Sequence, residues 1–149
     1  MSAEAEPGLS HNDTLTVGQR FESGWIDLNR DDLTKFWVGT RLDRAYGDFD
    51  DSYVPGFYLV ALLDPLAHSF FAGCSAFANA VNYGFDRLRF TAVVLPRDEL
   101  RLVCTVASIE PHRFGNLVSL DCELELKSGK PAVVARWLFL LSDRDLVEG

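Results

Sequence analysis

The longest apolar stretch of the chain, residues 52–74 (SYVPGFYLVALLDPLAHSFFAGC), limits what the sequence can fold into. Its Val-Pro-Gly step at 54–56 is a turn signal placed directly before an apolar run of helical length. A helix that is apolar on all sides has to be covered by other structure. We therefore expect one long buried helix over about residues 55–73. Pro65 cannot donate to the carbonyl four residues back, so a kink or break is expected near Leu62.

The chain after this run has the patterns of strands. Residues 99–110 alternate apolar and polar side chains, and residues 117–127 do so again before a Ser-Gly-Lys hairpin turn. Residues 79–90 and 132–142 add two more strands, with Gly84 as a bulge or close-approach point. Consecutive strands joined by short turns form an antiparallel meander. The predicted fold class is α+β, with a curved antiparallel sheet that wraps the helix.

The N-terminal part predicts a first strand over residues 20–26 and a short amphipathic helix over 30–38. Asn29 stands at the N-cap of that helix, with aspartates in its first turn. Residues 1–13 are small, polar and acidic, and we expect them to be a disordered tail before a single domain over residues 14–149.

The chain has 149 residues, of which 48% are hydrophobic, and a net charge of −8. The acidic balance argues against nucleic acids and anionic membrane surfaces as partners. No signal peptide is visible, and the apolar run is too often interrupted for a membrane span. Cys74, Cys104 and Cys122 lack CxxC spacing, which favours buried thiols in the cytoplasm over disulfides or a zinc site. The sequence points to no metal and no cofactor.

An acidic loop, residues 40–53 (TRLDRAYGDFDDSY), precedes the apolar run. Its Asp and Gly residues are typical of a solvated surface turn. The alternative is that one carboxylate turns inward beside the start of the helix and exchanges a proton with a ligand. The candidates for that role are Asp43, Asp48 and Asp51, with Tyr46 and Tyr53 as helpers.

The order of elements and three segments resemble the MaoC-like branch of the hot-dog fold, which contains (R)-specific enoyl-CoA hydratases and related dehydratases. The segments are residues 17–21 (VGQRF), 54–57 (VPGF) and 83–90 (YGFDRLRF), the last followed by Val93 and by residues 95–98 (LPRD). The resemblance covers about residues 15–142. It implies a single hot-dog domain, an acyl thioester carried by CoA or acyl carrier protein as substrate, and hydro-lyase chemistry.

The active-site motif departs from this family. The hydratases carry a D-x-x-x-x-H pair, and Asp43 best matches the aspartate by its place after the short helix. Five positions later the chain has Asp48 in place of histidine, and the segment between Asp43 and Gly56 is shorter than in the family. The related dehydratases carry an acidic residue in the helix after Pro-Gly, where this chain has Ala61. The usual acid/base pair is therefore not intact.

Unlike the acid/base pair, the backbone donors at the start of the helix are still expected in this chain. Free backbone N–H groups at Gly56 and Phe57 could polarise a thioester carbonyl, although Gly56 could also serve only the turn. His68 is a core or interface residue or, with Asp64 four positions earlier, an alternative base. Arg87 and Arg89 would either reach a phosphate of the carrier or form surface ion pairs.

Three functions stay open at this point. The first is a hydratase or dehydratase whose site is rebuilt around the aspartate loop. The second is a binding or partner subunit whose acid/base pair has been lost, and the third is a thioesterase. Because a hot-dog protomer leaves a sheet edge and a helix face uncovered, we expect a homodimer or a higher homo-oligomer.

Overall fold

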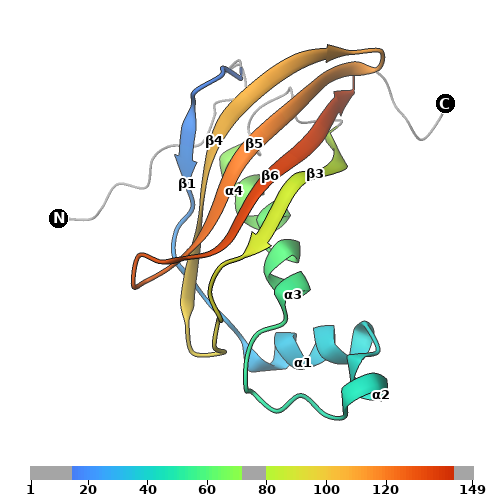
Figure 1. The fold of residues 1–149 in the computed structure, drawn as a ribbon, viewed down its shortest axis with the longest axis vertical. Helices are drawn as coiled ribbons and strands as arrows, with labels where there is room; N and C mark the ends of the chain where they lie inside the picture. The colour runs from blue at the N-terminus through green and yellow to red at the C-terminus, as the bar shows by residue number, and fades with distance from the viewer. Residues whose placement is uncertain (1–14, 72–79, 143–149) are drawn as a thin grey trace.

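One antiparallel sheet carries the fold, as the computed structural model shows for residues 15–71 and 80–142. Its strand order is β1-β4-β5-β6-β3, and β2 pairs with β4 beyond β1 (Figure 1). The strands are β1 (Arg20–Glu22), β2 (Ile26–Asp27), β3 (Ala80–Phe90), β4 (Glu99–His112), β5 (Gly115–Leu126) and β6 (Pro131–Ser142). The expected N-terminal tail, the helix end at Gly73 and Cys74 lie outside the described residues.

The long strands β4, β5 and β6 are the predicted meander. Their hairpins place Cys104 opposite Cys122 and Leu120 opposite Trp137. The side chains that alternate along β4, such as Leu102 and Val106, are buried, as predicted. The first hairpin turn is tighter than expected, because Pro111 still pairs with Asn116 inside the β4–β5 ladder.

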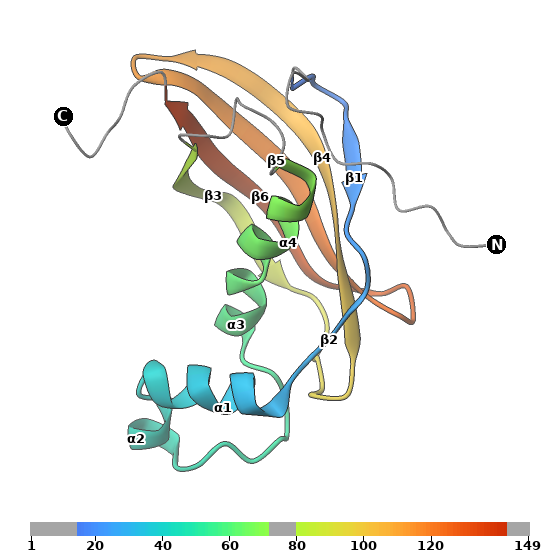
Figure 2. The same cartoon turned by 180° about the vertical axis from the view of Figure 1, so that it is seen from behind.

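In residues 15–71 and 80–142, four helices accompany the sheet: α1 (Arg30–Gly39), α2 (Leu42–Tyr46), α3 (Gly56–Ala61) and α4 (Leu63–Phe71). α3 and α4 cross one face of the sheet, while α1 and α2 lie beyond its end (Figure 2). The predicted cap of α1 is confirmed, because the Asn29 side chain accepts hydrogen bonds from the backbone N–H groups of Asp31 and Asp32. The short helix α2 was not predicted, since the acidic loop was expected to lack regular structure.

The expected single helix over 55–73 is two helices with a break at Leu62, close to the predicted position. Leu62 closes α3 by donating to Tyr58 and Leu59, and its own carbonyl then accepts from Leu66 in α4. Pro65 lacks the N–H that would have continued the ladder from Ala61. The predicted cause of the break therefore fits the observed geometry.

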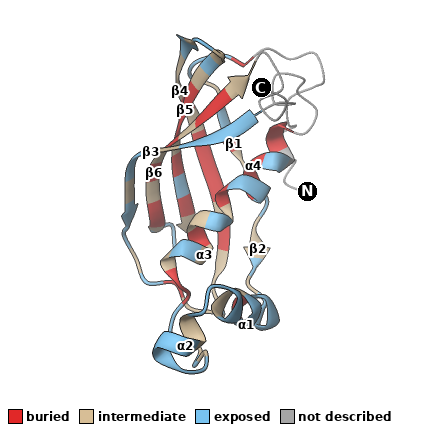
Figure 3. Ribbon diagram, turned by 90° about the vertical axis from the view of Figure 1, so that its right-hand side faces the viewer, coloured by how far each residue is buried: buried red, intermediate tan, exposed pale blue. Residues whose placement is uncertain are grey.

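Burial of the two helices is one-sided (Figure 3). α4 packs on the sheet through Phe70 and Phe71, whose rings lie 5.4 and 5.1 Å from that of Phe21 on β1. On the opposite side Phe57, Ala61, Asp64, Pro65 and His68 are exposed in the protomer. The expectation of a helix buried on every side is therefore wrong for the protomer, because the sheet covers one side only.

Strand β3 forms an open edge of the sheet. Of the strands that the structure describes, it pairs with β6 alone. The register is irregular between Asn82 and Gly84, where the bulge was predicted, and again between Phe85 and Arg87. Most of β3 is exposed, including the rings of Tyr83 and Phe90. At the other edge the predicted strand over residues 20–26 is divided into β1 and β2, because the Ser23 hydroxyl accepts from the Leu102 backbone N–H between them.

Candidate functional site

The start of α3 is tied to the segment that follows β3. The backbone N–H of Val54 donates to the carbonyl of Val94 at 2.7 Å, and both residues are buried. Pro55 then caps the helix, and its carbonyl accepts from Tyr58 and Leu59. This leaves the N–H groups of Gly56 and Phe57 without a hydrogen-bond acceptor among the described residues. Two parallel donors at a helix start suit an oxygen that carries negative charge.

A cavity of about 320 Å³ opens at these two donors. Its lining is mostly apolar: Tyr53, Val54, Gly56, Phe57, Leu59, Phe90, Ala92, Val93 and Val94. The exposed rings of Phe57 and Phe90 meet edge to face, with centroids 6.3 Å apart. We call this space the Gly56 cavity. Its shape and chemistry suit an acyl group whose carbonyl oxygen faces the helix start.

The Phe90 ring lies directly against the backbone of Gly56. A Cβ on this residue would lie 2.8 Å from Cε1 and 2.9 Å from Cζ of Phe90. Real Cβ atoms do not approach other carbons so closely, so any other residue would displace the Phe90 ring. Sequence analysis assigned Phe90 no role beyond the family-like segment, because its contact with Gly56 joins residues far apart in the chain.

The aspartates of the acidic loop do not line the Gly56 cavity. Asp51 pairs with Arg30 at 3.0 Å and has a positive φ of 64°. Its second carboxylate oxygen and one oxygen of Asp43 are buried without a hydrogen-bond partner among the described residues. Asp48 is exposed. The structure therefore leaves the choice among the three candidate aspartates open, and brings none of them to the helix start.

The two tyrosine candidates occupy different places. Tyr53 lines the Gly56 cavity and carries the only hydroxyl group in that lining. Tyr46 is exposed and packs its ring against Trp37, whose indole N–H donates to the Gly47 carbonyl at 2.7 Å. Of the two, only Tyr53 is positioned to meet a ligand at Gly56.

The suggested Asp64–His68 pair is not formed. Asp64 accepts a hydrogen bond from the side chain of Asn82 on β3 at 3.3 Å, and His68 is exposed one turn further along α4. The i, i+4 spacing allowed the two side chains to meet, but a contact with the neighbouring strand prevails. Sequence reasoning missed Asn82, because a single Asn on a strand gives no local signal of a partner.

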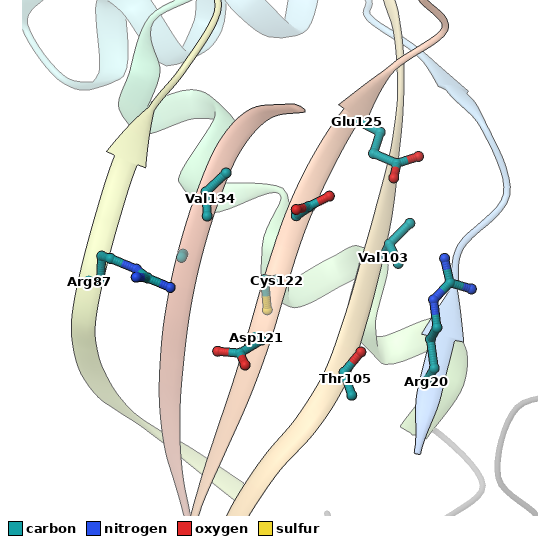
Figure 4. A pocket seen from close by; sticks show the side chains of 10 residues that line it. Arg20, Arg87, Val103, Thr105, Asp121, Cys122, Glu125 and Val134 are labelled. Carbon is teal, nitrogen blue, oxygen red and sulfur yellow. The ribbon is translucent and has the colours of Figure 1, made fainter. Parts of the chain in front are cut away.

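The two arginine candidates lie on the exposed strand β3. Arg87 lines a different cavity, of about 390 Å³, on the face of the sheet opposite the helices (Figure 4). Arg89 lies two positions further on, which in a strand corresponds to the same face as Arg87. Neither lines the Gly56 cavity, so a role in binding a phosphate would need a carrier that reaches around the edge of the sheet.

The cysteines that the structure describes, Cys104 and Cys122, are free and buried, as expected. Hydrogen bonding to Cys104, together with burial, raises the pKa of the Cys122 thiol well above its usual range. In the described ranges no group of three or more His, Cys, Asp or Glu side chains could hold a metal ion. No helix of the described chain is long and apolar enough to cross a membrane.

The chain resembles known proteins in sequence and in fold. The chain is 30% identical over 131 residues to the 3-hydroxyacyl-thioester dehydratase Z of Mycobacterium tuberculosis, covering 80% of this chain and 83% of the relative. No family model matches the sequence.

Three solved structures share the fold. The monoamine oxidase regulatory protein of Archaeoglobus has a TM-score of 0.72 at 14% identity and covers 94% of this chain and 98% of its own. A MaoC-like dehydratase from Rhodospirillum rubrum scores 0.66 at 18% identity, with 89% and 96% covered. The HadBC (3R-hydroxyacyl-ACP dehydratase) complex of M. tuberculosis scores 0.66 at 18% identity, with 85% and 97% covered. With its hot-dog sheet, its glycine at the helix start and its 30% identical relative, the chain belongs to the MaoC-like hydratase and dehydratase family.

Proposed function

We propose that this protein is a hydratase or dehydratase of acyl thioesters that binds the thioester carbonyl at the start of α3. The observation that carries the proposal is the pair of N–H groups at Gly56 and Phe57, which lack an acceptor among the described residues and belong to two residues that line an apolar cavity of about 320 Å³. The related dehydratase acts on 3-hydroxyacyl thioesters, which supports the same substrate class here. The carrier is CoA or acyl carrier protein.

Dehydration of such a substrate breaks two bonds. A base removes a proton from C2, the electrons form the C2–C3 double bond, and the C3 hydroxyl leaves with a proton as water. Negative charge gathers on the thioester oxygen as the C2 proton departs. The amides of Gly56 and Phe57 would stabilise that charge, a contribution worth about 10²–10³ in rate per donor in comparable sites. Hydration is the reverse sequence.

The second part of the proposed site, after the amides that bind the carbonyl, is the group that transfers the proton. Tyr53 lines the cavity and can hold the C3 oxygen by a hydrogen bond. We assign the acid/base role to the acidic loop. Asp43 and Asp51 are the preferred candidates over Asp48, because Asp43 and Asp51 each have a buried carboxylate oxygen that lacks a partner within the described chain. Such an oxygen is costly unless a proton, water or ligand meets it. In this proposal the loop approaches the cavity when substrate binds or a second subunit docks.

The open edge of β3 supports assembly into at least a homodimer. A strand with unpaired N–H and C=O groups and exposed Val81, Tyr83 and Phe85 is a template for a second strand. A two-subunit complex such as HadBC makes a heteromer the alternative. Gel filtration with light scattering on the purified chain distinguishes them: a dimer mass supports self-association, and a monomer at micromolar concentration supports an unlike partner. We place the protein in the cytoplasm, because buried free thiols suit a reducing compartment.

A second candidate is a catalytically silent subunit that holds an acyl thioester for a partner. It is favoured by the lining of the Gly56 cavity, which contains no carboxylate and no imidazole. Thioester hydrolysis with an aspartate as base is the third outcome, since the loop carboxylates could also activate water.

The test is incubation of the full chain with crotonyl-CoA and bulkier enoyl thioesters, followed by mass spectrometry. A 3-hydroxyacyl thioester product supports the proposal, and free CoA supports a thioesterase. Binding without turnover supports the silent subunit. Asp43→Asn and Asp51→Asn are compared with Asp48→Asn, and loss of the acting base lowers the rate about 10²–10⁴-fold. If all three variants keep full activity, the assignment of the acidic loop is wrong.

A further inference from the structure

A second cavity of about 320 Å³ lies further along the same helix. It is lined by Val60, Ala61, Leu63, Asp64, Asn82, Gly84, Phe85 and Trp137. Its lining residues belong to α3, α4, β3 and β6, whereas the Gly56 cavity is lined by the start of α3, the end of β3 and the segments next to them. In the fold, α3 and α4 run beside β3 (Figure 2). Phe90 contacts Gly56 at one end of the boundary between β3 and the helices, and Asn82 contacts Asp64 at the other end. We call the second space the Asp64 cavity.

Three polar side chains at the Asp64 cavity form a chain of hydrogen bonds. The indole N–H of Trp137, which is 6% exposed, donates to the Asn82 side-chain oxygen at 2.9 Å. That contact fixes which end of the Asn82 amide is the oxygen, so its NH₂ group faces Asp64, to which it donates at 3.3 Å. The buried indole thereby orients a polar pair at the rim of an otherwise apolar space.

The polar pair has hydrogen-bonding capacity left over. Asp64 uses one carboxylate oxygen for Asn82, and its other oxygen has no partner among the described residues. The Asn82 NH₂ group has two hydrogens and uses one in the same contact. A free acceptor therefore lies beside a free donor. A hydroxyl group complements both, because it donates one hydrogen bond and accepts another, whereas an ammonium group can only donate.

The spacing along the helix separates this pair from the reacting carbons. Gly56 begins α3 and Asp64 lies in the first turn of α4, eight residues later, which is about 12 Å at most because the helix breaks at Leu62. A thioester whose carbonyl binds at Gly56 has C2 and C3 within two bonds of that carbonyl carbon, so Asp64 cannot exchange their protons. A group that meets Asp64 must therefore stand near the far end of a medium-length acyl chain.

We propose that the Asp64 cavity binds a hydroxyl group at the distal end of the acyl chain, so that the protein prefers medium-chain acyl thioesters with an ω-hydroxyl. The hydroxyl donates to the free oxygen of Asp64 and accepts from the Asn82 NH₂ group. The apolar side chains of Val60, Ala61 and Leu63 contact the last methylenes. This inference rests on the proposed function, since it takes Gly56 as the position of the carbonyl.

The test is isothermal titration calorimetry of the full chain with ω-hydroxydecanoyl-CoA and with decanoyl-CoA, which has the same chain without the hydroxyl. Both are saturated, so neither can be hydrated during the measurement. We expect the hydroxylated ligand to bind about tenfold more tightly, because its hydrogen bond to water is exchanged for one to a charged acceptor. Asp64→Ala and Asn82→Ala abolish this ratio and leave the affinity for decanoyl-CoA within about twofold.

Glu123→Gln is the matched control, because it removes one negative charge from the opposite face of the sheet and keeps the tenfold ratio. Asp64 and Asn82 are exposed, so both alanine variants should fold, which circular dichroism checks. Equal affinity of the wild-type chain for the two ligands, or a ratio that survives Asp64→Ala, overturns the inference and leaves the proposed function standing. A retained ratio without hydration of any enoyl thioester overturns the proposed function alone, and binding of neither ligand overturns both.

Discussion

The two faces of the sheet carry cavities of similar size and opposite chemistry. On the outer face, charged side chains such as Asp121, Glu123 and Glu125 line the cavity (Figure 4). Arg136 donates to both oxygens of Asp121 at 2.9 and 3.1 Å, and Arg101 contacts Glu125 at 3.0 Å. On the helix face the cavities are mostly apolar, and the few polar groups in them keep unused hydrogen bonds. Unused donors and acceptors, rather than cavity volume, identify the ligand site.

The largest effect is expected at Gly56. Gly56→Val forces the Phe90 ring away and fills the space in front of the two amides, so kcat/KM for an enoyl thioester should fall at least about a hundredfold. Steady-state kinetics measure it. Gly24→Ala is the control, because a Cβ there meets nothing within 4 Å. Full activity of the Gly56→Val variant would mean that the carbonyl binds elsewhere.

The inner face of β5 should carry the stability of the fold. Leu120→Ala removes a fully buried side chain from the core, and we expect a loss of about 2–5 kcal/mol in the free energy of unfolding. Urea denaturation followed by circular dichroism measures it. A loss below about 1 kcal/mol would show that the sheet face is less tightly packed than the structure indicates.

Alkaline pH should weaken the contact between α1 and α3. Burial, with a smaller contribution from Asp32, raises the pKa of Tyr58 above its ordinary 10.0, and its ring packs 5.3 Å from Phe36. Above the ordinary pKa the unfolded chain loses this proton while the folded chain keeps it, so stability falls as pH rises. Tyr58→Phe should flatten this loss above about pH 10 in urea titrations. Tyr46→Phe, at an exposed ring, should leave the loss unchanged.

The smallest effect is expected on the outer face. Arg136→Gln breaks the pair with Asp121, but both side chains are more than two-fifths exposed, so water replaces the lost contact. We expect no resolvable change in the urea midpoint and no change in acyl-thioester binding. A clear loss of binding would move the ligand site to the outer face and reverse the comparison.

The sequence predicted the features that depend on local pattern. The alternation in β4, the Asn29 cap and the break at Leu62 follow from side-chain period, capping and proline chemistry within a few residues. Their causes are local, so they can be found without coordinates.

The features that were missed depend on contacts between distant segments. Asp64 was paired with His68 on its own helix, but it meets Asn82, eighteen positions away on β3. Phe90 covers Gly56 from the far end of that strand. The aspartates of the acidic loop are close to the helix start in sequence, but none of them lines the Gly56 cavity. Proximity along the chain therefore overstated their proximity to the cavity.

The most direct test of the central claim is the ¹H–¹⁵N spectrum of the labelled full chain during titration with decanoyl-CoA. If the carbonyl binds at the start of α3, the amide resonances of Gly56 and Phe57 shift most, in the direction of stronger hydrogen bonding. The amides of Thr105 and Glu123, which line the outer cavity, stay in place. Shifts confined to the outer cavity, with Gly56 and Phe57 unmoved at saturation, would contradict the account.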